Sequence, residues 1–311
     1  MTLALVFPGQ GSQSVGMLAE LASQFAQVKD TFAEASEALG YDLWQLIQSG
    51  PDSELQLTAV TQPAMLTAGV AVWRAWQAAG GPVPRVMAGH SLGEYGALVC
   101  AGALPFAQAV QLVRRRGECM QQAVPPGVGA MAAVLGLERT AVEAACVTAA
   151  TAEETVSVAN YNAPLQSVIA GHAGAVSRAA NAAQANGAKR VVPLPVSAPF
   201  HCSLMRPAAD QMAPALAAAQ VVAPTLPVIN NVDVAIASEP AAIRDALLRQ
   251  IYSPVRWVEV VQAMNTLGVT HVVECGPGKV LAGLTKRICG NLESLAVQDP
   301  SSLRQALAAL G

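Results

Sequence analysis

The sequence predicts an α/β protein, with a main domain built on a parallel sheet and a smaller unit inserted into it. Three observations predict this class. Short apolar runs alternate with amphipathic segments, as in parallel α/β sheets. Residues 127–196 have the expected order strand-helix-strand-strand-helix-strand, which is that of a ferredoxin-like unit. One apolar run ends in Gly-x-Ser-x-Gly, the pattern of a strand, a sharp turn and a helix. With 311 residues, the chain is long enough to bury a large core and a smaller one.

The first 126 residues are expected to form one part of the main domain. Leu3–Phe7 and Val86–Ala88 are apolar runs of strand length. The helix-like segments follow in chain order: Phe25–Leu39, Asp42–Gln48, Ser53–Leu57, Gln62–Gln77 and Pro105–Ala123. The last of them runs into Pro125-Pro126-Gly127, which ends a helix.

Residues 127–196 are expected to form the ferredoxin-like subdomain. Four segments have strand character: Gly129–Leu135, Val156–Asn160, Ser167–Gly171 and Lys189–Leu194. Two helices, Thr140–Ala149 and Ala173–Asn186, lie between them. The turn at Ala163-Pro164 joins the middle strands.

Residues 197–311 return to the α/β pattern. Strands are expected at Pro227–Asn230, His271–Cys275 and near Ser294–Val297. Helices are expected at Pro207–Ala219, Glu239–Ile251, Trp257–Leu267, Val280–Ile288 and from Ser301 onward. Together, 1–126 and 197–311 predict one discontinuous domain, and the cleft beside the inserted unit is a favoured place for a ligand.

The composition excludes several classes of function. A net charge of −3 and a pI of about 5.8 provide no electrostatic footprint for nucleic acid. The most apolar stretch, residues 96–113, is interrupted by Pro105, Gln108 and Gln111, so we expect no membrane helix. The N-terminal run lacks a basic region, so we expect no signal peptide. None of the six cysteines has metal-ligand spacing, which predicts free thiols, no metal and a cytoplasmic setting.

Ser91 is the candidate nucleophile. It lies between Gly89 and Gly93, where the absence of side chains lets a strained turn expose its hydroxyl. The helix after the turn directs its N-terminal amides at that oxygen. The alternative is a glycine-rich surface turn with an incidental serine.

His201 is the candidate base, because it lies in an irregular segment after the inserted unit. The other histidines are expected to be structural: His90, His172 and His271. The neighbouring Cys202 is a weaker candidate nucleophile, since no positive cluster surrounds it. No aspartate lies between Ser91 and His201. A Ser-His pair, with a carbonyl or amide orienting the imidazole, is therefore expected.

Two further features concern charge. The amide of Leu92 and an amide of the loop around Gln10, which glycines flank, are candidates for binding an oxyanion. A phosphate-binding loop is the alternative for that loop, but the lysine of such loops is absent. Arg116 follows the apolar phase of its helix and is expected to be buried, where a carboxylate would satisfy it.

Several motifs occur together and in order. They are Pro8-Gly9-Gln10-Gly11-Ser12-Gln13, Gly89-His90-Ser91-Leu92-Gly93-Glu94-Tyr95, Arg116-Gly117, Ser197-x-Pro199-x-His201, Gln250 in Gln-Ile-Tyr-Ser-Pro-Val-Arg-Trp, and Glu274-Cys275-Gly276-Pro277-Gly278-Lys279-Val280-Leu281. On these motifs the chain resembles the malonyl-CoA:acyl carrier protein transacylases of fatty-acid synthesis, from residue 3 to its end.

The resemblance implies a fold and a set of roles. The fold is an α/β-hydrolase-like core with a ferredoxin-like subdomain. Ser91 takes the malonyl group, and His201 is general base and then acid. The amides of Gln10 and Leu92 form the oxyanion hole, and Arg116 binds the malonyl carboxylate. The backbone carbonyl of Gln250 orients His201. Further residues are implied near the acyl pocket: Asn160, Asn162 and Phe200.

The resemblance also implies malonyl-CoA and holo-acyl carrier protein as partners, and neither a cofactor nor a metal. Acyl carrier proteins are acidic, so a basic rim is expected among Lys189, Arg190, Lys279, Lys286 and Arg287. A serine esterase or thioesterase, a polyketide-pathway acyltransferase and a non-catalytic carrier-docking module remain alternatives.

Overall fold

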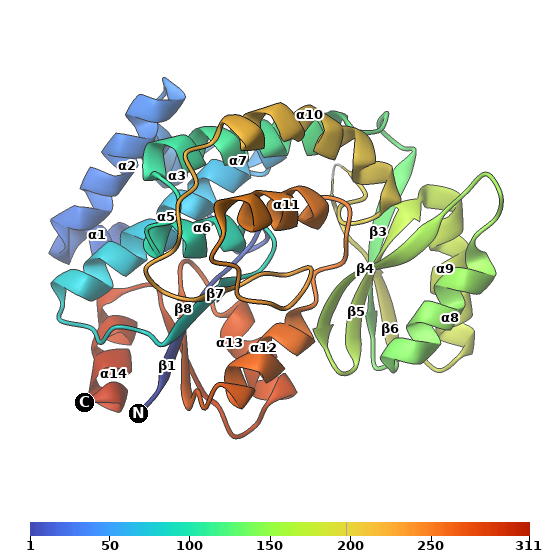
Figure 1. Cartoon of the computed structure of the whole chain (residues 1–311). Helices are drawn as coiled ribbons and strands as arrows, with labels where there is room; N and C mark the ends of the chain where they lie inside the picture. Colours follow the sequence, from blue (N-terminus) through green and yellow to red (C-terminus); the bar gives the residue numbers. More distant parts are fainter. Residues whose placement is uncertain (197) are drawn as a thin grey trace.

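The computed structural model describes residues 1–196 and 198–311, and Figure 1 shows that they form a large α/β body with a smaller one beside it. Ser197, part of the predicted motif with Pro199 and His201, lies outside the described residues. No helix in the described part of the chain combines the length and apolar character needed to cross a membrane.

The main sheet has five parallel strands in the order β7-β2-β1-β8-β9. The strands are β1 (Leu3–Phe7), β2 (Val86–Gly89), β7 (Val228–Ile229), β8 (His271–Cys275) and β9 (Glu293–Val297). All five residues of β1 are buried, as in a central strand with both faces covered. Ala4 pairs with Val86 on one side and with Val272 on the other. The predicted parallel α/β core is therefore confirmed.

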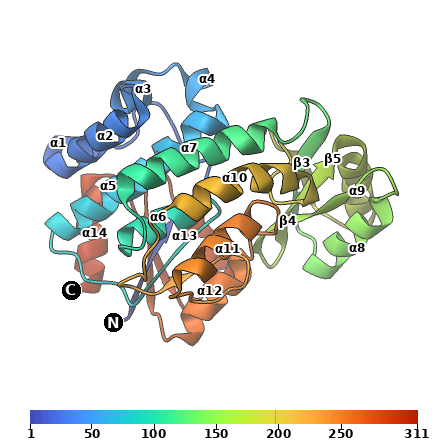
Figure 2. The ribbon, with the colours of Figure 1, turned by 45° about the horizontal axis from the view of Figure 1, so that its top comes forward.

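Helices cover both faces of this sheet. Leu3, Leu5 and Phe7 point into the larger core, whereas Ala4 and Val6 point into the smaller one. The larger core is formed with α1 (Ala19–Gln24), α2 (Ala26–Leu39), α3 (Leu43–Ser49), α4 (Asp52–Leu55), α5 (Thr58–Ala78), α6 (Gly93–Cys100), α7 (Phe106–Gln122), α10 (Arg206–Ala218), α11 (Pro240–Gln250) and α14 (Pro300–Leu310). The smaller core is formed with α12 (Trp257–Thr266) and α13 (Val280–Ile288). Figure 2 shows α7 and α10 side by side, both reaching from the large body to the small one.

The second sheet is antiparallel, with the order β4-β5-β3-β6. Its strands are β3 (Gly129–Leu135), β4 (Val156–Ala163), β5 (Gln166–His172) and β6 (Arg190–Pro193). Helices α8 (Arg139–Ala149) and α9 (Ala173–Ala185) pack on one face. The predicted ferredoxin-like element order is confirmed, and all four strands fall within 127–196.

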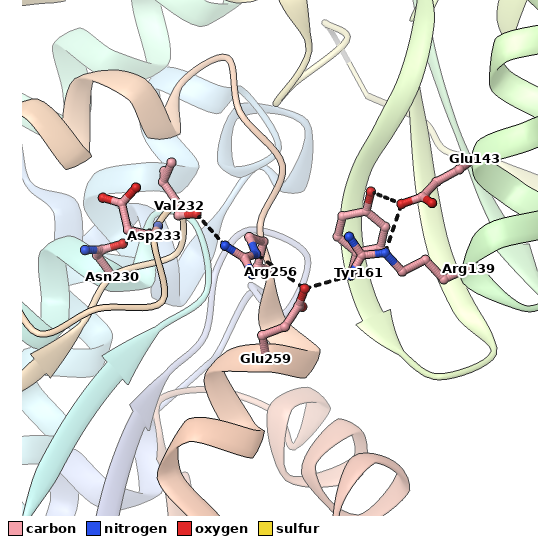
Figure 3. A network of polar contacts seen from close by, with 8 residues as sticks. All are labelled: Arg139, Glu143, Tyr161, Asn230, Val232, Asp233, Arg256 and Glu259. Carbon is pink, nitrogen blue, oxygen red and sulfur yellow. Dashed lines mark hydrogen bonds and ion pairs between the residues drawn. The ribbon is translucent and has the colours of Figure 1, made fainter. Parts of the chain in front are cut away.

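Backbone and side-chain contacts join the two bodies. Tyr161 N donates to Val255 O at 2.9 Å, and Val255 N donates to Ala159 O at 2.9 Å, so the chain before α12 extends the edge of β4. Arg139 of α8 stacks on the Tyr161 ring at 3.8 Å and donates to Glu259 of α12 at 2.7 Å, as Figure 3 shows. These contacts fix the small sheet to the large body through β4.

A few elements differ from the sequence expectations. The six-residue α1 was not predicted, because it is too short to display an amphipathic period. Helix α5 begins at Thr58 rather than Gln62, and Pro63 lies inside it. Strand β4 continues to Ala163, since bulges after Val158 and Tyr161 break the alternation that marks a strand.

Candidate active site

Ser91 lies on the predicted sharp turn between β2 and α6. Its φ of 52° is in the left-handed region that a serine seldom adopts. The two flanking glycines make the turn possible. A Cβ on Gly89 would lie 1.9 Å from the carbonyl carbon of Gly93, and a Cβ on Gly93 would lie 2.0 Å from Phe7 O. A side chain at Gly89 would push the end of β2 away from the start of α6, and one at Gly93 would push the turn away from β1.

Asn231, just after β7, holds the turn from the other side. Its Oδ1 accepts from Ser91 N at 2.7 Å, and its Nδ2 donates to Gly89 O at 2.7 Å. One buried amide therefore holds both the nitrogen of the strained residue and the carbonyl of Gly89 before it, which offsets the cost of the unusual backbone conformation.

His201 is brought to Ser91 from the segment after the small sheet. Its Nε2 lies 2.7 Å from Ser91 Oγ, and its Nδ1 lies 2.8 Å from the backbone oxygen of Gln250. A carbonyl only accepts, so Nδ1 carries the hydrogen and Nε2 presents its lone pair to the serine hydroxyl. Burial, with the nearby charge of Arg116, lowers the pKa of His201 to about 3. The imidazole is consequently neutral, in its basic form, at physiological pH.

Arg116 of α7 is 1% exposed and lies beside the same hydroxyl. It donates to Gln62 Oε1 at 2.9 Å, to Gln250 Oε1 at 2.9 Å and to Ser91 Oγ at 3.2 Å. Its Nε has no hydrogen-bond partner among the described residues. Burial lowers the pKa of Arg116. The guanidinium is thus held by neutral acceptors and can still receive an anion.

Two cavities meet at Ser91. The outer one, of about 450 Å³, lies between the two bodies, and its wall includes Asn160 and Phe200. The inner one, of about 40 Å³, is lined by Arg116 and Met120 among others. Since a cavity needs about 10–15 Å³ of such space to hold one water molecule, the inner cavity holds a group of only a few atoms. A long substrate can therefore occupy the outer cavity and place only a small end group on Arg116.

The loop after β1 forms one wall of both cavities. Gly9 lets it approach the turn closely, because a Cβ there would lie 2.8 Å from His90 O. Gln10 lines both cavities, and Leu92 lines the inner one. Within the part of the chain that the structure describes, the amides of Gln10 and Leu92 donate to no acceptor. Both amides are thus free to bind an oxygen beside Ser91.

The structure separates the two asparagines named from the sequence. Asn160 lines the outer cavity, whereas Asn162 lines neither cavity. The Oδ1 of Asn162 lies 2.8 Å from Nε2 of His90, whose ring packs near Trp257. His90 is therefore a packed and hydrogen-bonded residue, as the sequence predicts.

The remaining candidates line neither cavity. His172 accepts from Thr155 N at 3.0 Å, and His271 lies 3.2 Å from Glu293. Cys202 donates to Pro199 O, and burial raises its pKa to about 11, so it is not a thiolate at neutral pH. Among the residues described, no cluster of three or more His, Cys, Asp or Glu is placed to hold a metal.

Four polar side chains of the site are not predicted by the sequence: Gln62, Glu94, Asn231 and Gln250. Glu94 Oε2 accepts from Asn231 N at 2.9 Å and from Gln250 Nε2 at 2.8 Å. Burial raises the pKa of Glu94 to about 7, although these two hydrogen bonds and Arg116 oppose the rise. For Gln62 and Glu94, the sequence signal that could have indicated a site residue is a polar side chain within an apolar helical stretch.

Comparison with known proteins gives a consistent result. A family model described as an acyl transferase domain matches residues 4–296. The chain is 58% identical to the malonyl CoA-acyl carrier protein transacylase of Salmonella typhimurium over 304 residues, 98% of each chain. It is similar to the crystal structure of an acyl carrier protein S-malonyltransferase from Vibrio cholerae, with a TM-score of 0.96 and 58% identity, covering 98% of this chain and 100% of the other. It is also similar to a malonyl-transacylase in complex with a type II PKS acyl-carrier protein, with a TM-score of 0.97 and 54% identity, covering 99% and 100%.

Proposed function

Since the chain belongs to the acyl transferase family, we propose that it transfers a malonyl group from malonyl-CoA to the phosphopantetheine thiol of holo-acyl carrier protein, for fatty-acid synthesis. One observation carries the proposal. The hydroxyl of Ser91 lies within hydrogen-bond distance of both a neutral imidazole and a buried guanidinium. The first can activate the serine, and the second can bind a carboxylate on the acyl group it receives.

The first half-reaction loads the enzyme. Ser91 Oγ attacks the thioester carbonyl carbon, and its proton passes to Nε2 of His201. The oxygen of the tetrahedral intermediate accepts from the amides of Gln10 and Leu92. The C–S bond then breaks, His201 returns the proton to the CoA sulfur, and a malonyl-serine ester remains.

The second half-reaction repeats these steps in reverse with a new thiol. The phosphopantetheine sulfur attacks the ester carbonyl, its proton passes to His201, and Ser91 leaves with that proton. The backbone oxygen of Gln250 orients the imidazole and stabilises the positive charge that it carries transiently. No step needs a cofactor or a metal.

Arg116 is proposed to select the acyl group. The small inner cavity accommodates the terminal carboxylate of malonyl, which the guanidinium binds. An acetyl group would leave that charge without an anion, so acetyl-CoA is expected to be a poor substrate. Asn160 and Phe200 would contact the substrate from the outer wall. Asn162 would act on it only through His90.

The acyl carrier protein is proposed to dock at the cleft between the core, residues 1–126 and 197–311, and the subdomain, residues 127–196. The similar malonyl-transacylase bound to a carrier protein supports this partner. The cations proposed to bind an acidic carrier are exposed: Lys189, Arg190, Lys279, Lys286 and Arg287. The free cysteines among the described residues support a cytoplasmic location.

Supply of a polyketide carrier is a second candidate, favoured by the similarity to the transacylase bound to a type II PKS carrier. The chemistry is the same, and only the carrier differs. Transfer rates to purified fatty-acid and polyketide carriers would decide between them.

Intact mass spectrometry tests the proposal. Mixing the enzyme with malonyl-CoA should add one malonyl group, and addition of holo-acyl carrier protein should move that group to the carrier. Ser91→Ala should abolish the adduct. An adduct that persists in this variant, for example on Cys202, would overturn the assignment of the nucleophile. Rapid loss of the adduct to water without a carrier would favour a thioesterase instead.

A further inference from the structure

Glu94 is a buried carboxylate at the centre of the site that the proposed reaction does not use. It is the second residue of α6, three positions after Ser91, and is 2% exposed. Its Oε2 accepts from two groups that each hold part of the site, the amide of Asn231 and the side chain of Gln250. It contacts neither cavity.

The side chain of Gln250 has one orientation that satisfies its surroundings. Its Nε2 donates to Ser91 O at 3.0 Å and to Glu94 Oε2 at 2.8 Å, while its Oε1 accepts from Arg116 at 2.9 Å. Rotating the amide by half a turn would set its hydrogens against the guanidinium and its oxygen against two acceptors. Glu94 is one of the two acceptors that oppose this rotation.

We infer that Glu94 is a positioning residue for the choice of acyl group: it fixes the amide of Gln250, which in turn fixes Arg116 at the inner cavity. The inference rests on the proposed malonyl transfer. Among the described residues, Arg116 has two fixed acceptors besides the reacting hydroxyl, Gln62 and Gln250. Loss of one lets the guanidinium tilt, and a bidentate contact to a carboxylate depends on its orientation.

The inference predicts that an acceptor at this place matters more than a negative charge. Glu94→Gln keeps an oxygen at the same reach and loses the charge. Glu94→Asp keeps the charge but withdraws the oxygen by one methylene, too far for a 2.8 Å hydrogen bond. Glu94→Met removes the acceptor and keeps a side chain of similar length.

Glu274 provides a matched control. It is also a buried glutamate whose pKa burial raises to about 7, and it lies at the end of β8 with an oxygen accepting from Ala282 N. It lines neither the outer nor the inner cavity. Glu274→Gln therefore reports what neutralising a buried carboxylate does to this fold alone.

The measurement is the ratio of kcat/KM for loading from malonyl-CoA to that from acetyl-CoA, with a thermal melt of every variant. Glu94→Gln and Glu274→Gln should keep the wild-type ratio within about threefold. Glu94→Asp and Glu94→Met should lower it about tenfold or more, the range of one hydrogen bond to a charged group. A purely structural role would lower the melting temperature and both rates while leaving the ratio unchanged.

Two results would overturn the inference: a wild-type ratio in both Glu94→Asp and Glu94→Met, or a ratio that Asp preserves and Gln loses, which would make charge the determinant. Loading of the wild-type enzyme tests the proposed function separately from the variants. If the wild-type enzyme takes no malonyl group from malonyl-CoA, the proposed function fails and this inference fails with it. If the wild type loads normally, the variants test the inference alone.

Discussion

Replacing Arg116 with alanine should change which acyl group the enzyme accepts more than how fast it turns over. The guanidinium is buried and touches the nucleophile, so a malonyl carboxylate in the inner cavity would lie in direct contact with it. Acetyl places no charge there. The substitution therefore removes an interaction that only one of the two substrates makes.

The size of the effect follows from the geometry. Two unit charges about 4 Å apart interact with about 4 kcal/mol at an effective dielectric constant of about 20. Such a loss corresponds to about a thousandfold in kcat/KM. Removal of Arg116 also leaves the Oε1 atoms of Gln62 and Gln250 without their donor, which affects both substrates alike. We expect kcat/KM for malonyl-CoA to fall about a hundredfold to a thousandfold, and that for acetyl-CoA by less than about tenfold.

The assay is competitive loading of Ser91 from equal concentrations of malonyl-CoA and acetyl-CoA, read by intact mass. Arg115→Ala is the control, since Arg115 lies on the same helix but is exposed and donates to Gln211 O at 3.3 Å rather than to a residue of the site. It should leave the malonyl to acetyl ratio unchanged. An equal loss for both substrates in Arg116→Ala would show instead that the arginine serves the nucleophile rather than the carboxylate.

Three other predictions concern the base, the turn and the junction between the two bodies. Because the pKa of His201 is lowered to about 3, its basic form persists on acidification, and kcat/KM for loading should stay flat from pH 8 down to about 5; a fall centred near pH 6.5 would contradict this. Gly93→Ala should lower the free energy of unfolding by more than about 3 kcal/mol. Gly290→Ala is the control, because its added Cβ meets nothing within 4 Å, and it should change the free energy of unfolding by less than about 1 kcal/mol. Similar urea midpoints for the two variants would contradict a steric role for Gly93. Arg139→Ala should cost about 1 kcal/mol or less and lose its effect in high salt, since the bridge to Glu259 is partly exposed; a loss that salt leaves unchanged would show that stacking, not charge, dominates.

Much of the site could be predicted from local sequence. The two glycines around Ser91 define a turn by the space they leave, and the apolar phase of α7 places Arg116 inward. The lack of an aspartate agrees with the backbone carbonyl found beside His201. The first two of these signals lie within a few residues along the chain, whereas the missing aspartate is a property of the whole stretch between Ser91 and His201.

The supporting shell could not be predicted in this way. The shell comes from three elements: Gln62 from α5, Asn231 from the segment after β7, and the side chain of Gln250 from the end of α11. Gln62 is more than 140 residues away from either of the other two. Their contacts arise only when the sheet order brings these ends together. No spacing or period of the sequence encodes such a meeting.

The position of β1 in the sheet also has a consequence for how the protein is made. The first strand of the chain lies at the centre of the main sheet, and its partner on one side, β8, begins only at His271. At about 5–20 residues per second, the roughly 180 residues between β2 and β8 take about 10–35 s to synthesise. During that time an entirely apolar strand has one unpaired edge, which is a template for association with other chains. We therefore expect a nascent chain of this protein to be a substrate for chaperones that bind short apolar segments until β8 has left the ribosome.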